Sequence, residues 1–431
     1  MKFKKYTDTK LGETVYCGKH ESGLEIRVLP KEGYSSAYAV FGVKYGSIDT
    51  AVKNADGEFE TIPEGTAHFL EHKLFESEDL NAFERFAKTG ASANAYTSFE
   101  KTAYLFKGSD KIEESLGILL DFVQNPYFTQ QTVEKEQGII GQEIRMYQDL
   151  PDWQVMFNML KALYSNHPVR IDIAGTQESI AQIDADLLYR LYENFYNPAN
   201  MVLCIVGDTD CEKVAEIVEK NIKKNKGTEC ERKFEKEDPV PVNNYIEEKL
   251  SVAQKQFMLG FKEDITEPLL SLEDEMASQI MLEAVTGKAS PLFKKLLDEE
   301  LIDMGFGSEL FNGFGFSCVM LGGTSKDPER AADIIKAEFA KLNAEGINPE
   351  AFARAKRKLY GRMVMNYNDI DDTANMLMNL YFNGYEPFAE IEACKSVTLE
   401  KAQERLSVLK ENGIDAYVIG EIIEGDEKVI L

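Results

Sequence analysis

Two histidines and a glutamate stand close together in the segment His68-Phe69-Leu70-Glu71-His72. On a helix, side chains at positions i, i+3 and i+4 share one face, so both imidazoles and the carboxylate would point into one small volume. Two imidazoles one turn apart are typical ligands for a divalent metal such as zinc. The chain has only 4 histidines in 431 residues. The segment therefore predicts a metal site in which Glu71 lies beside the ion without being a ligand.

A third ligand must come from elsewhere, because a catalytic zinc has three protein ligands whereas a structural zinc has four, typically with cysteines. The 6 cysteines are scattered and form no Cys-x-x-Cys pair, so a carboxylate or another histidine should complete the set. We expect His20 and His167 to be surface or turn residues. Glu136 and Glu143 lie seven residues apart on a predicted helix, about 10 Å along its axis, so only one could reach the ion. Either could also be an ordinary acidic residue on a solvated helix face.

The composition describes an ordinary globular protein with 44% apolar and 28% charged residues. A net charge of −26 argues against nucleic acid and anionic membranes as partners. The N-terminal residues are not followed by an apolar run, and no stretch is long and apolar enough to span a membrane. Cys204 and Cys318 lie in apolar, strand-like runs, where buried free thiols are expected. We therefore expect a cytoplasmic protein.

The length of 431 residues exceeds what one hydrophobic core usually serves, so two domains are expected. Residues 223–242 are rich in charge and contain two prolines, which is typical of a linker. We predict a catalytic zinc-binding domain at 1–225, a linker at 226–242 and a homologous domain without zinc ligands at 243–431.

An internal repeat supports this division. An offset of 220 residues superposes Thr66 on Thr286, and residues 147–149 on 367–369. Two separated anchors that share one offset suggest a duplicated domain. Under that register the metal-site positions coincide with Lys288, Pro291, Leu292 and Met363. We therefore expect one zinc site per chain.

The hydrophobic pattern predicts alternating strands and helices. Predicted strands lie at 24–29, 36–45, 90–97, 101–107, 201–206, 254–261 and 315–322. Predicted helices follow residue 64 and lie at 81–88, 109–123 (capped by Ser109), 129–147 (capped by Thr129), 153–164, 186–195, 269–285, 328–342 and 349–367.

The motif His68-x-x-Glu71-His72, followed some seventy residues later by Glu136-x6-Glu143, resembles the inverted-zincin metallopeptidases of the pitrilysin, insulin-degrading and mitochondrial-processing-peptidase family. Residues 90–97 and 196–207 also look like landmarks of that family, so the resemblance covers the whole chain. It implies that Glu143 is the third zinc ligand and that Glu136 supports the site without ligating. It also implies that the strand with Asn94 and Ala95 pairs with an extended peptide substrate.

The resemblance further implies the α+β fold class, with two homologous domains, each an antiparallel-rich mixed sheet covered by helices, in a chain that forms half of a clam-shell chamber. The implied activity is hydrolysis of short or unfolded peptides by a zinc endopeptidase with one Zn²⁺ per chain. In such an enzyme zinc acidifies a water molecule, and Glu71 would take its proton as general base. A non-catalytic assembly subunit of the same fold and a metal-dependent lyase of a small thioether are the alternatives.

A half-size chain of this family should dimerise, since its members close two such units around the substrate. In the family an Arg and a Tyr from a zinc-free domain often face the substrate carbonyl, and Ser317 stands about where that Arg would be. The missing cation would remove a donor for the developing oxyanion. We therefore expect either a homodimer or a heterodimer with a zinc-free homologous subunit.

Overall fold

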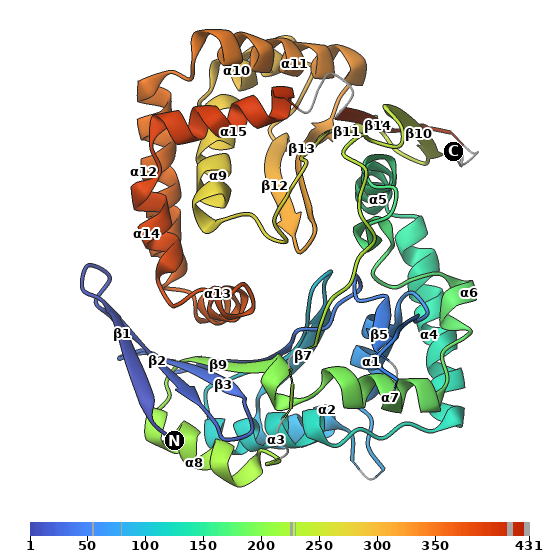
Figure 1. Ribbon diagram of the computed structural model, residues 1–431, viewed down its shortest axis with the longest axis vertical. Coiled ribbons are helices and arrows are strands. Elements are labelled where there is room, and N and C mark those ends of the chain that lie inside the picture. Colours follow the sequence, from blue (N-terminus) through green and yellow to red (C-terminus); the bar gives the residue numbers. More distant parts are fainter. Residues whose placement is uncertain (54–55, 79, 225–226, 229, 412–416, 426–431) are drawn as a thin grey trace. The chain divides into compact units, whose positions relative to one another are not determined.

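The computed structural model describes residues 1–431 except 54–55, 79, 225–226, 229, 412–416 and 426–431. The chain forms two compact units (Figure 1). Unit 1 comprises Met1–Ile144, Asp172–Lys233 and Val364–Phe388, and unit 2 comprises Arg145–Ile171, Phe234–Met363 and Ala389–Leu431. The predicted domain limits of 1–225, 226–242 and 243–431 describe the repeat along the sequence and stay a proposal. No helix in the described part of the chain is long and apolar enough to cross a membrane.

Unit 1 is built on a seven-stranded mixed sheet. Its strands, in spatial order, are β1 (Phe3–Asp8), β2 (Glu13–Lys19), β3 (Glu25–Pro30), β9 (Met201–Gly207), β4 (Ala37–Val43), β8 (Thr102–Gly108) and β7 (Ser92–Thr97). Only β3 and β9 run parallel, and the other neighbours are antiparallel. β4 and β9 are buried along their whole length. Their continuous apolar runs are explained because helices cover both faces of the sheet, α3 (Ile112–Gln124) on one and α13 (Ile370–Phe382) on the other (Figure 1).

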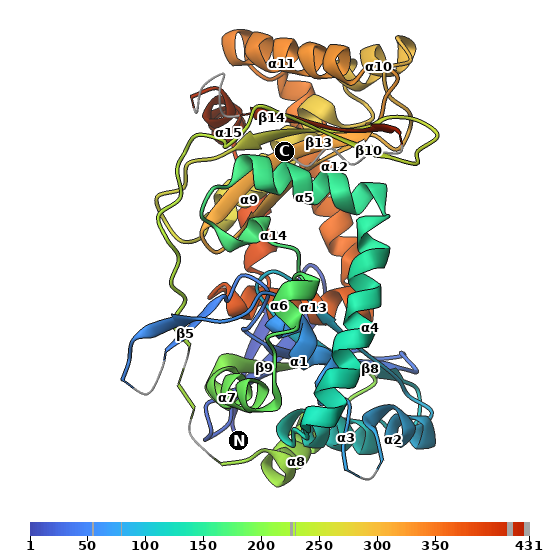
Figure 2. The ribbon, with the colours of Figure 1, turned by 90° about the vertical axis from the view of Figure 1, so that its right-hand side faces the viewer.

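Unit 2 is built on a five-stranded sheet with the same topology as the last five strands of the first sheet. Its spatial order is β10 (Tyr245–Leu250), β14 (Tyr417–Glu424), β11 (Gln256–Lys262), β13 (Phe316–Thr324) and β12 (Gly307–Gly313). β10 and β14 are its one parallel pair. Helix α5 (Pro151–Leu163) lies on one face and α11 (Pro328–Glu345) on the other (Figure 2). The predicted α+β class, with antiparallel-rich mixed sheets covered by helices, is confirmed.

The order of elements along the chain also repeats. The first copy contains α1 (Thr66–Leu74), α2 (Ala82–Thr89), α4 (Gln130–Gln148), α6 (Gln177–Ile180) and α7 (Ala185–Phe195), with the small sheet β5 (Ala51–Lys53) and β6 (Phe59–Thr61) and helix α8 (Cys211–Asn221) as additions. The second contains α9 (Leu272–Thr286), α10 (Pro291–Asp298), α12 (Pro349–Asn366), α14 (Ala389–Ser396) and α15 (Leu399–Glu411). The offset of 220 holds to within one or two residues for the long helices α4 and α12 but is wrong for the metal helix. Thr66 begins α1 whereas Thr286 ends α9, because the segments between elements differ in length.

Each repeat gives one helix to the sheet of the other. α5 follows α4 in the chain but packs on β10, β11 and β14, and α13 follows α12 but packs on β4 and β9. Cations of the first sheet fix α13: the Arg27 guanidinium donates to the carbonyls of Leu377 at 3.1 Å and Tyr385 at 2.9 Å, and Lys44 donates to Phe382 at 3.2 Å. This exchange explains why the two units are discontinuous in sequence.

Local predictions had mixed outcomes. Thr129 caps α4, since its hydroxyl accepts from the Thr132 N–H at 3.2 Å. The predicted cap at Ser109 is wrong: α3 begins at Ile112, and its N-cap is Lys111, which has a φ of 49° and makes no side-chain cap hydrogen bond. All described cysteines are free thiols, and Cys204 and Cys318 are fully buried as predicted.

The predicted linker is held to the units by ion pairs. The Arg232 guanidinium binds the Asp49 carboxylate at 2.8 and 3.0 Å within unit 1. Glu237 accepts from Lys262 at 2.8 Å within unit 2. These side chains are mostly buried, so the segment is anchored at both ends and is not a solvated tether.

Candidate metal centre

Helix α1 is placed by a close approach of two backbone segments within unit 1. It begins after Gly65, whose φ is +81°, a conformation that favours glycine. A Cβ at this position would lie 2.3 Å from the carbonyl oxygen of Ala174, so only glycine permits the contact. The helix then buries Phe69 and Leu70 completely in the core. His68, Glu71 and His72 are left on the side that meets α4 and β7.

The structure brings His68, His72 and Glu143 together. His68 Nε2 lies 3.8 Å from Glu143 Oε1, and His72 Nε2 lies 3.6 Å from Glu143 Oε2. These distances are too long for hydrogen bonds. Two ligands of one tetrahedral zinc, each about 2.0–2.1 Å from it, lie about 3.4 Å apart. One potential ligand atom from each residue falls within 4.8 Å of the others, and no other group of this kind occurs in the described part of the chain. The donor set therefore fits a zinc ion.

The surroundings of the two imidazoles shift their pKa values in opposite directions. Burial, together with the neighbouring His72, lowers the pKa of His68 to about 3. Its imidazole is therefore neutral at physiological pH, as a metal ligand must be. Burial also opposes a charge on His72, but the hydrogen bond to Glu136 and the nearby carboxylates outweigh burial and raise the pKa of His72. His72 is thus the imidazole at which a proton competes with a metal.

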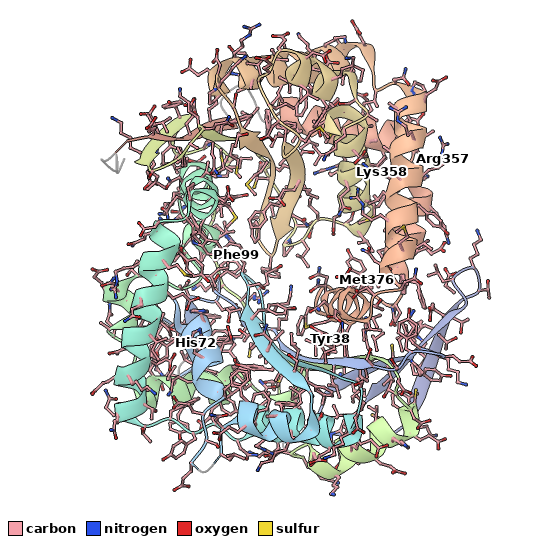
Figure 3. The ribbon with its side chains drawn as sticks, turned by 180° about the vertical axis from the view of Figure 1, so that it is seen from behind. Tyr38, His72, Phe99, Arg357, Lys358 and Met376 are labelled. Atoms are coloured by element: carbon pink, nitrogen blue, oxygen red, sulfur yellow. The ribbon has the colours of Figure 1, made fainter. Side chains whose placement is uncertain are left out.

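Glu136 lies on the face of α4 that is turned to the site. Its Oε1 is 3.0 Å from His72 Nδ1, and 7% of the residue is exposed. Burial raises the pKa of Glu136, but the hydrogen bond from His72 dominates and lowers it. The alternative of a solvated surface glutamate is therefore wrong for Glu136. Its contact fixes the ring of His72, whose Nε2 is then directed towards Glu143. Figure 3 shows where His72 lies in the structure.

Glu71 lies outside the group of three and is 8% exposed. The Thr97 hydroxyl of β7 donates to Glu71 Oε2 at 2.9 Å. Burial raises the pKa of Glu71 despite the opposing effects of His72 and Thr97. A buried carboxyl whose pKa is raised is suited to taking and returning a proton. Thr97 was not predicted as a site residue, although it closes the recognised 90–97 segment.

Asn94 and Ala95 lie on β7, the outermost strand of the seven-stranded sheet. Within the described residues β7 pairs only with β8, so no strand occupies its other side, where an extended peptide can add to a sheet. The Asn94 side chain accepts from the Ala95 N–H at 2.9 Å. Tyr96 donates to Asn375 of α13 at 2.6 Å, and Asn375 donates to Tyr38 at 3.1 Å. The strand is therefore braced by the exchanged helix.

His20 and His167 are not surface residues. They are 2% and 1% exposed, and each is engaged within its own turn. His20 Nδ1 lies 2.8 Å from the Ser22 hydroxyl, and His167 Nδ1 accepts from the Val169 N–H at 3.1 Å. The prediction of turn residues is confirmed and that of surface residues is wrong, because a polar turn does not reveal what covers it. Neither histidine belongs to the metal cluster.

Ser317 cannot stand where a substrate-facing arginine would be. It is fully buried in unit 2, and its hydroxyl donates to Glu263 at 2.8 Å. Glu263 is in turn paired with Arg405 at 2.6 Å. A side chain at position 317 therefore points into the interior, and that expectation is wrong.

Comparison with known proteins shows the family of the chain. Residues 58–177 match the family described as insulinase (peptidase family M16), and residues 182–359 match the peptidase M16 inactive domain. YmfH of Bacillus subtilis, an uncharacterized zinc protease, is 41% identical over 91% of this chain and 93% of its own length.

Solved structures that resemble this chain also come from proteins described as M16-like peptidases or share their fold. A protein described as an M16-like peptidase from Alicyclobacillus acidocaldarius has a TM-score of 0.90 and 35% identity, with 99% of each chain covered. Pitrilysin shares the fold at a TM-score of 0.76 and 15% identity, with 100% of this chain but 47% of pitrilysin covered. The chain therefore belongs to peptidase family M16, as a half-size member.

Proposed function

We propose that this chain is a zinc-dependent endopeptidase that hydrolyses short or unfolded peptides. The observation that carries the proposal is the convergence of His68, His72 and Glu143 to within 4.8 Å, beside a buried carboxylate, Glu71, that is outside the group. Three ligands with an adjacent free base is the composition of a catalytic rather than a structural zinc site. The zinc-protease names of the relatives support it.

In this proposal each residue has one task. A bound zinc supplies Lewis-acid polarisation of a peptide carbonyl and acidification of a water molecule. His68, His72 and Glu143 would hold the ion, one per chain, and Glu136 would fix the ring of His72 through Nδ1.

Glu71 would receive a proton on its carboxylate during attack on the peptide bond and return it to the departing amine. The free side of β7 at Asn94 and Ala95 would bind the peptide backbone as an added strand. A peptide held there would lie beside Glu71, because Thr97 of the same strand donates to the Glu71 carboxylate.

We further propose that the working protein is a dimer in the cytoplasm. This chain covers 47% of pitrilysin, so a second unit of the same fold would be needed to match its size and to close a chamber around the substrate. The second unit would be another copy or a zinc-free homologous subunit. Full turnover by a purified homodimer would contradict the heterodimer, whereas weak activity that a co-expressed homologue restores would support it.

The deciding experiment is a peptide-library digestion with the purified chain, combined with zinc analysis. We expect hydrolysis that a chelator abolishes and added zinc restores. Glu71→Gln should retain zinc while hydrolysis falls by about 100-fold or more, as when a general base is removed. Hydrolysis that survives zinc removal would overturn the proposal. A zinc-loaded chain that cleaves no peptide would favour the non-catalytic subunit, and cleavage of a small thioether instead would favour the lyase.

A further inference from the structure

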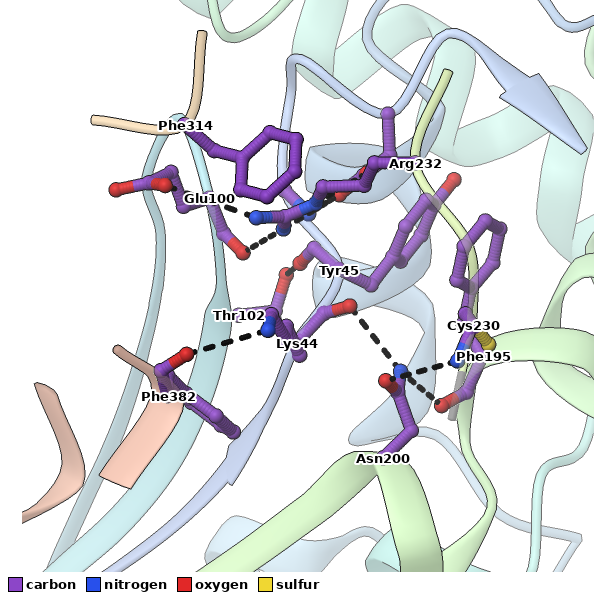
Figure 4. Close-up of polar contacts among 12 residues, drawn as sticks. Lys44, Tyr45, Glu100, Thr102, Phe195, Asn200, Cys230, Arg232, Phe314 and Phe382 are labelled. Atoms are coloured by element: carbon purple, nitrogen blue, oxygen red, sulfur yellow. Dashed lines mark hydrogen bonds and ion pairs between the residues drawn. The ribbon is translucent and has the colours of Figure 1, made fainter. Parts of the chain in front are cut away.

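A row of hydroxyl groups runs from Glu71 into the core of unit 1, beginning at the partly buried Thr97 and continuing to the buried Thr102. The Thr97 hydroxyl donates to Glu71 Oε2 at 2.9 Å. Thr102 of the neighbouring strand β8 lies behind it, with 3.5 Å between the two threonine oxygens. Thr102 is fully buried and donates to the carbonyl of Tyr45 at 2.9 Å (Figure 4).

Two buried tyrosines lie next to this row. The Tyr196 hydroxyl lies 2.8 Å from the hydroxyl of Tyr104, which follows Thr102 by two residues on β8. Burial raises the pKa of Tyr104 well above 10, so it stays a neutral hydroxyl. Tyr196 opens the 196–207 segment, in which Asn200 donates to the carbonyls of Lys44 at 3.1 Å and Phe195 at 3.0 Å (Figure 4). The segment therefore holds the tyrosine beside the row in place.

The number of hydroxyl protons decides which group donates and which accepts in each hydrogen bond of the row. Each hydroxyl has one proton to donate. Thr102 gives its proton to the Tyr45 carbonyl, so towards its neighbours it can only accept. Thr97 can donate either to Thr102 at 3.5 Å or to the Glu71 carboxylate at 2.9 Å, and the shorter bond to a charged acceptor is the stronger one. The Thr97 proton is therefore directed at Glu71.

The tether matters because a carboxylate is itself a good zinc ligand. Glu71 lies between His68 and His72 on one helix face, and Thr97 is the one described residue whose side chain hydrogen-bonds it. A fourth protein ligand would close the coordination position that a catalytic zinc keeps open. We propose that Thr97 is a positioning residue that holds the Glu71 carboxylate out of the metal-ligand set and so keeps it available as a base. This inference rests on the proposed function.

The test compares Thr97→Val, which keeps the shape and loses the hydroxyl, with Thr97→Ser, which keeps the hydroxyl. Ser92→Ala, on the exposed part of the same strand, is the matched control. Each full-length protein is loaded with zinc for kinetics and with Co²⁺ for visible absorption, whose band positions and intensities report the number and type of ligands.

We expect Thr97→Val to change the Co²⁺ spectrum of the wild type and to lower kcat about 10–100-fold, with KM altered less than about threefold. Thr97→Ser should restore both the spectrum and kcat to within about threefold of wild type, and Ser92→Ala should change neither. Adding Glu71→Ala to Thr97→Val should remove the new spectrum, because the swinging carboxylate is then absent.

A Thr97→Val protein with the wild-type Co²⁺ spectrum would overturn the inference, as would a Thr97→Ser protein no better than Thr97→Val. Failure of the proposed function looks different: the wild-type chain would then bind neither zinc nor Co²⁺, or would bind them without hydrolysing peptides.

Discussion

The two repeats place a pair of helices at the same edge of the same sheet topology but join them with different groups. In unit 1, His72 of α1 meets Glu136 of α4 at 3.0 Å and Glu143 at 3.6 Å. In unit 2, Glu283 of α9 meets Lys358 of α12 at 2.6 Å, and 46% of the Lys358 side chain is exposed. In the solvated ion pair the two opposite charges balance each other. A cluster of partly buried imidazoles and carboxylates instead favours a bound cation.

The contact between the edge strand and the helix is kept in both units. Thr97 of β7 donates to Glu71 of α1 at 2.9 Å, and Ser308 of β12 lies 2.6 Å from the Thr286 hydroxyl of α9. Unit 2 therefore retains the polar link between strand and helix but places a neutral hydroxyl where unit 1 has a carboxylate. The comparison teaches that the fold specifies where the helix pair meets the sheet edge, and that a few side chains decide whether the place can do chemistry.

The difference between the two units should be reduced most by neutralising Glu143, the carboxylate that lies near both imidazoles. Glu143→Gln should weaken zinc binding by more than about 100-fold, beyond the effect of removing a group that only supports a ligand. Zinc occupancy at buffered low free zinc is the measurement. Wild-type occupancy in the variant would remove Glu143 from the site.

Glu136→Gln should have the next largest effect, about 10–100-fold in zinc affinity or in hydrolysis, because Glu136 contacts the ring of His72 and not the ion. Glu134→Gln is the matched control, since Glu134 is exposed on the same helix and contacts only Gln130 among the described side chains. If Glu136→Gln and Glu134→Gln have the same zinc affinity and the same rate of hydrolysis, the contact between Glu136 and His72 does not contribute to function.

How far the sequence could predict this site depends on the range of each contact. The spacing of His68, Glu71 and His72 is local, so helix geometry alone places them on one face. Glu136 and Glu143 remained equivalent on geometry, and only the family resemblance distinguished them. Which glutamate meets both imidazoles depends on how α4 packs against α1, and this long-range contact leaves no local pattern.

The sequence also could not predict that α5 and α13 each pack on the sheet of the other repeat. A periodic apolar pattern reveals that α5 and α13 each have a face to bury, but not which sheet covers it. The carbonyl groups that receive the Arg27 guanidinium lie some 350 residues further along the chain. The burial of His20 and His167 was not predicted for the same reason. The sequence predicts that both lie in turns, but not that other segments pack over those turns.

Lowering the pH should weaken zinc binding by about tenfold per pH unit once the pH is below the pKa of His72. This slope is the one expected when a single proton competes with the ion. The pKa of His72 is raised above its usual value of 6.5, so its proton competes with zinc below that raised pKa. The pKa of His68 is lowered to about 3, so His68 releases no proton when zinc binds near pH 6. Proton release measured by calorimetry in several buffers should give one proton at about pH 6. Two protons would mean that the imidazoles are equivalent.

The smallest effect is expected in unit 2, where the helix pair is joined by the solvated ion pair. Lys358→Met and Glu283→Gln should leave zinc content and hydrolysis unchanged and lower the free energy of unfolding by less than about 1 kcal/mol each, the usual size for exposed pairs. A double-mutant cycle between them should give a coupling below about 1 kcal/mol, measured by denaturant unfolding. A coupling of several kcal/mol, or lost hydrolysis, would mean that this helix pair is a second working site, and the contrast between the units would fail.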